Sequence, residues 1–168
     1  MAMRGAILKF ALTLPLVVLG FVAVANGSDG ALPSDIYGRW VVKRLITTSN
    51  VTAMTSAEAK AMMGSVAIYS ASRVRFRVRA SSRRFGLENF VVEHPKYRLT
   101  RDSADRFFRD NYLSPRDIGI LTEYVEDIDI QNADGTDVNE PATLLYVRDK
   151  NHLVTIWDGG YFEMVRQR

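Results

Sequence analysis

Cysteine is absent from this chain of 168 residues. Its absence excludes disulfide bonds, thiol nucleophiles, thiolate-ligated metals and the lipid attachment of a bacterial lipoprotein. Histidine is scarce as well, since the sequence holds only His94 and His152, about sixty residues apart. No Gly-x-Ser-x-Gly, His-Glu-x-x-His or phosphate-binding glycine loop occurs. We therefore expect a protein that is not an enzyme and that has no cofactor and no metal site.

A strong charge of one sign is also missing. The formal net charge is +3, but Arg4 and Lys9 lie in the first 25 residues, which contain no acid. Without these two, the 22 basic residues fall to 20, against 19 acidic ones. A nearly neutral chain gives no support to a nucleic-acid partner.

Residues 1–25 are typical of a signal peptide. Arg4 and Lys9 supply positive charge, residues 10–22 are almost wholly apolar, and residues 23–25 fit the small-residue cleavage pattern. The alternative is an uncleaved anchor, which the short run with its Pro15 and Gly20 disfavours. We expect a periplasmic or secreted protein that meets the membrane only through this leader. Residues 26–35 are expected to form a linker, and residues 36–168 one domain.

The strongest strand signal begins at Gly38-Arg39-Trp40 and continues to about residue 46, in residue types that suit a half-buried pleated surface. Three further runs at 144–148, 152–157 and 161–166 end the chain, and Asp-Gly between the last two is a strong hairpin signal. In the last run Arg166 shares a face with apolar residues, which suggests a guanidinium stacked on a buried ring.

These residues carry a resemblance to a known family. Gly38 and Trp40 on the first strand, the meander of strands and Arg166 on the last strand resemble the lipocalins and their calycin relatives. Residues 40–64 are also similar to small exported bacterial lipocalin-like proteins. The resemblance implies a mainly-β fold, an antiparallel lipocalin-like (calycin) β-barrel. The Trp would close one end of that barrel, and the Arg would pack over it.

Two helices are predicted within this fold. Thr55 and Glu58 form a capping box, with Met54 in the place of a hydrophobic staple and Gly64 as the stop. This short helix could lie over a barrel mouth. A second, mid-chain helix should run from Asp102 or Ser103 to about residue 113. Four residues at helical spacing should form one face of this helix that packs against the barrel: Ala104, Phe107, Phe108 and Tyr112. Further strands are expected at 65–69, 73–80, 85–92 and 120–130.

Residues 73–80 alternate arginine with smaller or apolar residues. On a strand, alternation places the four guanidinium groups on one face along ~20 Å; these are Arg73, Arg75, Arg77 and Arg79. One interpretation is a docking surface for an acidic partner protein. The other is a solvated outer face whose arginines pair with the acids Glu123, Asp127 and Asp129.

Two functions from different classes follow. The first is a binding protein for a small apolar ligand held under the helix, and its candidate ligand-binding residues are Trp40, Met54, Met62, Met63 and Phe76. The alternative is a protein-interaction module, such as a periplasmic inhibitor or immunity protein, that docks through the arginine strand. In both cases we expect a monomer. The interior discriminates between them, because a barrel of this size can be filled by its own side chains.

Overall fold

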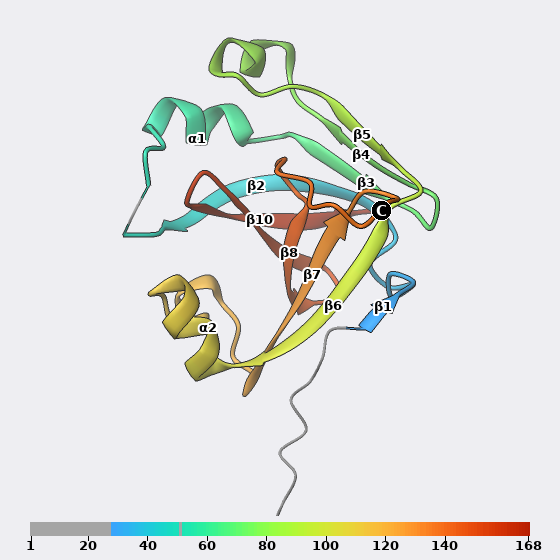
Figure 1. Cartoon of the computed structure of the whole chain (residues 1–168). Helices are drawn as coiled ribbons and strands as arrows, with labels where there is room; N and C mark the ends of the chain where they lie inside the picture. Colours follow the sequence, from blue (N-terminus) through green and yellow to red (C-terminus); the bar gives the residue numbers. More distant parts are fainter. Residues whose placement is uncertain (1–27, 51) are drawn as a thin grey trace, which may run out of the picture.

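The computed structural model describes residues 28–50 and 52–168, so the expected signal peptide at residues 1–25 lies outside the described part. The fold is a single antiparallel sheet curled into a half barrel, with helices at its margins (Figure 1). The strand order across the sheet is β1-β6-β7-β8-β9-β10-β2-β3-β4-β5. The mainly-β, antiparallel prediction is therefore confirmed, as are the short helix and the second, mid-chain helix.

The elements follow one another in chain order. The strands are β1 Ser28–Gly30, β2 Gly38–Thr48, β3 Val66–Tyr69, β4 Arg73–Arg77, β5 Phe90–Glu93, β6 Lys96–Ser103, β7 Tyr124–Gln131, β8 Leu144–Asp149, β9 His152–Trp157 and β10 Gly160–Gln167. The α-helices are α1 Ser56–Met62 and α2 Ala104–Asn111, and the 3-10 helices are η1 Ala80–Phe85 and η2 Pro115–Ile118.

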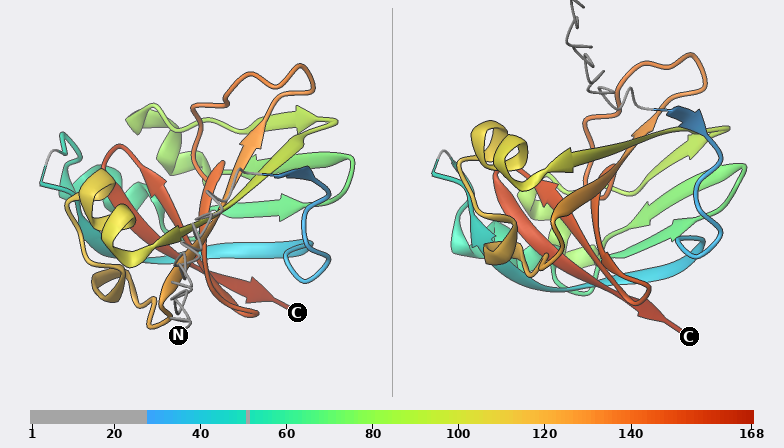
Figure 2. Two further views of the ribbon diagram at one scale, coloured as in Figure 1. Left: turned by 60° about the horizontal axis from the view of Figure 1, so that its bottom comes forward. Right: turned by 90° about the horizontal axis from the view of Figure 1, so that it is seen from below.

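The sheet curls but does not close within the described residues. β5 is one edge and β1 the other, and β5 turns into β6 through His94-Pro95 without pairing with it. His94 adopts a left-handed φ of 49° at this corner. Figure 2 shows β3, β4 and β5 diverging from β6 on the open side. The lipocalin resemblance implies a closed barrel, whereas the described residues form a half barrel.

Apolar side chains pack on both faces of the sheet. The inner cluster fills the concave side and includes Trp40, Phe76, Phe162 and Met164. The outer cluster lies beneath α2 and η2 and includes Phe107. Strands with two buried faces do not show a simple alternation of apolar and polar residues.

The fold reaches into the segment that we expected to be a linker. Within residues 26–35, β1 pairs with β6 through Ser28↔Leu99, and Leu32 is 2% exposed in the inner cluster. A segment dominated by polar and small residues hides this role, because its contribution is backbone pairing and one buried leucine.

Two local predictions are corrected. The strand expected at 85–92 is shortened to β5, because η1 continues to Phe85 and residues 86–89 form a turn and an irregular segment. The Ser82 hydroxyl donates to the Ala61 carbonyl at 2.6 Å and ties η1 to α1. In α2 only Phe107 enters the core. Phe108 is 53% exposed although it lies within the helix, and Tyr112 is 72% exposed because α2 ends at Asn111 and Tyr112 takes a left-handed cap.

Candidate binding surfaces

Trp40 is buried in the inner cluster, with Arg166 stacked on it. Trp40 has no exposed surface, and its indole Nε1 donates to the Ile36 carbonyl at 2.8 Å. Arg166 lies opposite it in the β2–β10 register, with its guanidinium carbon 4.4 Å from the centre of the ring. The guanidinium also donates to the carbonyls of Tyr37 and Lys150. The stacking predicted for this Arg is confirmed.

The five candidate ligand-binding residues do not surround one cavity. Trp40, Met62 and Phe76 are completely buried in the inner cluster, and none of them lines the pockets described below. Met54 borders a space of about 320 Å³ beside Trp157, whereas Met63 borders a different groove. At these positions the interior is therefore filled with side chains.

An apolar pocket opens elsewhere, at the end of the interior near Ile36. It has a volume of about 370 Å³, and Leu99, Ile128 and Val147 form its apolar walls. Arg101 and Glu126 stand at its charged side. Sequence reasoning missed this site, because aliphatic residues on strands indicate core packing and give no sign that a space remains between them.

A larger cleft, of about 770 Å³, lies on the outer side of β6 and β7, and six of its fifteen lining residues are acidic. Asp129 pairs with Arg98, and Asp102 pairs with Arg106 at 3.3 Å. Burial, together with the charges of Asp102 and Asp129, raises the pKa of Asp127 to about 7. The cleft is thus a partly neutralised set of carboxylates, and Asp127 carries a proton for part of its time near neutral pH.

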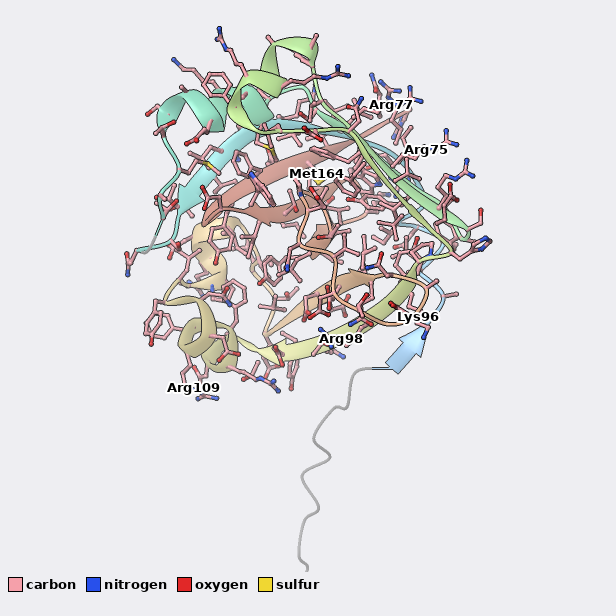
Figure 3. The ribbon with its side chains drawn as sticks, turned by 45° about the horizontal axis from the view of Figure 1, so that its top comes forward. Arg75, Arg77, Lys96, Arg98, Arg109 and Met164 are labelled. Carbon is pink, nitrogen blue, oxygen red and sulfur yellow. The ribbon has the colours of Figure 1, made fainter. Side chains whose placement is uncertain are left out.

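The acids expected to pair with the arginine strand do not do so. Asp127 and Asp129 lie on β7, whose neighbours are β6 and β8, whereas β4 lies between β3 and β5. Figure 3 shows Arg75 and Arg77 projecting on one side of the molecule and Arg98, the partner of Asp129, on the other. That prediction was wrong. Strand order decides which side chains meet, and the alternation of residues within one strand does not predict strand order.

Three of the four arginines lie on β4, and two of these have no acidic partner. Arg73 pairs with Glu93 of β5 at 2.7 Å. Neither Arg75 nor Arg77 has an acid within ion-pair distance in the described part of the chain. We expected Arg79 on the same strand, but it lies two residues beyond the end of β4, at the N-cap position of η1.

The surface around these arginines extends onto neighbouring strands. The register aligns Arg39 of β2, Ile68 of β3, Arg75 of β4 and Val91 of β5 across the sheet. Val91 is 53% exposed, so apolar surface lies beside the charges. We call this surface the cationic face, and its basic residues are Arg39, Lys43, Arg73, Arg75, Arg77 and Arg79. In both views α2 lies at the opposite end of the molecule from β3, β4 and β5 (Figures 1 and 2).

Comparison with known proteins finds no matching family model, no matching curated protein and no matching solved structure. Within the described residues, no helix has the length and apolar character needed to cross a membrane. The same residues contain no group of three or more His, Asp or Glu side chains placed to hold a metal ion.

Proposed function

We propose that this protein is an exported, lipocalin-like interaction module that binds an acidic partner protein through the cationic face. The observation that carries the proposal is the pair Arg75 and Arg77, which stand side by side on an open sheet surface without an acidic neighbour in the described residues. Uncompensated guanidinium groups repel one another, and an acidic partner would relieve this repulsion while pairing in a bidentate manner.

The apolar residues of the face also support a protein partner. In the register Ile68 lies between Arg39 and Arg75, and Val91 lies on the other side of Arg75, so a partner would bury aliphatic surface while it neutralises charge. Interfaces combine such an apolar centre with arginine. An inhibitor or an immunity protein, each of which acts by covering a partner, fits this surface.

The test is direct binding of a labelled oligoglutamate peptide. The wild-type protein should bind the peptide, and binding should weaken with added salt because exposed charges are screened. Replacement of Arg73, Arg75 and Arg77 by Gln should weaken binding about ten-fold, since each exposed pair contributes ~0.5–1 kcal/mol. The melting temperature should change little, because these side chains point outward.

A matched control removes the same charge elsewhere. Lys96, Arg109 and Arg116 are exposed, and Figure 3 shows Lys96 and Arg109 in the lower part of the view, below Arg75 and Arg77. Their triple replacement by Gln should leave oligoglutamate binding close to that of the wild type. Equal weakening in both triple variants would mean that net charge alone attracts the peptide, and the proposed docking surface would be refuted.

A second candidate function is the binding of a small apolar ligand, which the pocket near Ile36 favours. Its volume of about 370 Å³ is within the range of small-molecule sites. Leu99→Trp should fill the pocket and abolish binding of Nile red, whereas Leu121→Trp, at a position 80% exposed, should not. Unchanged dye fluorescence with Leu99→Trp would exclude this pocket as the site.

A further inference from the structure

A groove of about 340 Å³ crosses the cationic face where β2 meets the turn between α1 and β3. Arg39, Lys43 and Arg79 line it, together with the amide of Gln167. No Asp or Glu is among its lining residues, and its apolar side chains are Val41, Met63 and Val66, with Gly64 between them; Val42 also borders the groove, but its side chain is buried in the inner cluster. The groove therefore offers hydrogen-bond donors and positive charge above an aliphatic floor.

A β-bulge brings Lys43 to this groove. In the pairing of β2 with β10, Val42 faces Met164 and Arg44 faces Glu163, so Lys43 is the extra residue between them. A bulge redirects the side chain of the extra residue. Two backbone hydrogen bonds fix the adjacent turn to the same point, from the Gly64 amide to the Val42 carbonyl at 2.8 Å and from the Val42 amide to the Ser65 carbonyl at 2.9 Å.

The turn at Gly64 holds Arg79 in place. A Cβ atom at Gly64 would lie 2.5 Å from Nη2 and 2.6 Å from Nε of Arg79, so the guanidinium rests directly on the backbone of the glycine. The φ of Gly64 is +77°, which also favours glycine. Arg79 thereby reaches the groove even though it lies beyond the end of β4.

Gln167 is oriented by its neighbour. Its Oε1 accepts a hydrogen bond from Nε of Arg39 at 2.5 Å, which leaves the amide nitrogen free to donate. The three basic side chains and this amide thus present donors to one space. An oxyanion carried on an aliphatic stem matches both the donors and the apolar floor.

We propose that the groove between Arg39, Lys43 and Arg79 is the subsite that receives a carboxylate side chain of the acidic partner. The inference rests on the proposed function, because it assigns one contact within the docking of that partner. Glutamate fits better than a compact inorganic ion, since its two methylene groups can lie against Val41, Val66 and Met63 while the carboxylate meets the donors.

The test uses a single carboxylate as the probe. The N-acetyl amide of glutamate should cause saturable shifts of the Lys43 and Gly64 backbone amides in a two-dimensional NMR spectrum, and the corresponding derivative of glutamine should not. Arg79→Gln should weaken the glutamate response about ten-fold, as expected for the loss of one charge-assisted contact. Arg83→Gln, which removes the same charge from η1 but does not line the groove, should leave it unchanged.

A second variant separates geometry from charge. Gly64→Ala keeps every basic residue but would push Arg79 off the backbone, so the glutamate response should fall although the net charge is unaltered. A melting curve establishes whether the Gly64→Ala variant is folded. If it is not, the comparison of Arg79→Gln with Arg83→Gln still tests the subsite.

The outcomes distinguish this subsite from the function on which it rests. If wild-type protein binds oligoglutamate but the Lys43 and Gly64 amides do not respond to the glutamate probe, the subsite is refuted and the docking face stands. A response to inorganic phosphate without one to glutamate would also refute it. If oligoglutamate does not bind at all, the proposed function itself fails.

Discussion

Replacement of Trp40 by Ala tests the packing of the inner cluster most directly. Trp40 is fully buried at the end of β2, makes a hydrogen bond to the Ile36 carbonyl and supports Arg166 on its ring. The substitution removes the largest side chain of the inner cluster. It also leaves a backbone carbonyl without its donor and a guanidinium without its stacking surface.

The expected loss can be worked out from these contacts. A buried aromatic side chain removes ~150–250 Å² from water, and truncation of Phe or Trp to Ala costs ~3–5 kcal/mol in most cores. Arg166→Ala should cost less, about 1–2 kcal/mol, because it loses one cation–π contact and two hydrogen bonds to carbonyls at a partly exposed site. The two effects should not be additive, since the residues are in contact; the coupling should be about 0.5–2 kcal/mol.

The assay is urea unfolding followed by circular dichroism, for the wild type, both single variants and the double variant. Trp157→Ala is the control, since this second tryptophan is partly exposed and should cost clearly less. A free energy of unfolding for Trp40→Ala within 1 kcal/mol of the wild type would show that the ring is not buried in solution. Strict additivity of the Trp40 and Arg166 effects would refute the stacking.

Two further predictions concern buried carboxylates. Because burial raises the pKa of Asp127 from 3.8 to about 7, the folded state binds more protons than the unfolded state between these values, and stability should fall as the pH rises through this range. Asp127→Asn should remove this decrease in stability and stabilise the protein above pH 7 by about 1–2 kcal/mol, a figure reduced for partial exposure. The control Glu126→Gln should leave the pH dependence of stability unchanged. Parallel pH dependence of the wild type and Asp127→Asn would contradict the prediction. Glu163→Gln should destabilise by about 2–3 kcal/mol, because it leaves Arg148 and Arg44 without the carboxylate they share. A hydrogen bond from Arg44 lowers the pKa of Glu163, so its contribution is present above pH ~4.5 and lost as the pH falls through the lowered pKa; an equal loss at pH 7 and at low pH would contradict this assignment.

Local signals in the sequence predicted local structure well. The capping box of Thr55 and Glu58 is present at the start of α1, and the strand predicted at 152–157 is β9. Arg166 stacks on Trp40 as expected, although 126 positions of sequence separate them. Each of these features depends on a residue type whose physical role is narrow, such as a hydroxyl that caps or a planar cation that covers a ring.

Features that depend on strand order could not be predicted in the same way. The alternation of Arg73, Arg75 and Arg77 places them on one face, but which acid faces them is decided by the neighbours of β4. The groove depends on a bulge at Lys43 and on the contact between Gly64 and Arg79, which join three separate elements. A glycine followed fifteen residues later by an arginine gives no sequence signal of that contact.

The distribution of covered and open surface explains why the cationic face is the place to expect a partner. Apart from the pocket near Ile36, the concave side of the sheet is occupied by its own side chains, and α2 and η2 pack on the outer cluster around Phe107. The outer side of β3, β4 and β5 bears exposed charge instead, although Ile68 and Val91 give it apolar surface as well. Arginines beside aliphatic residues keep such a surface soluble when it is free, and they favour an acidic partner over a neutral one when it is covered.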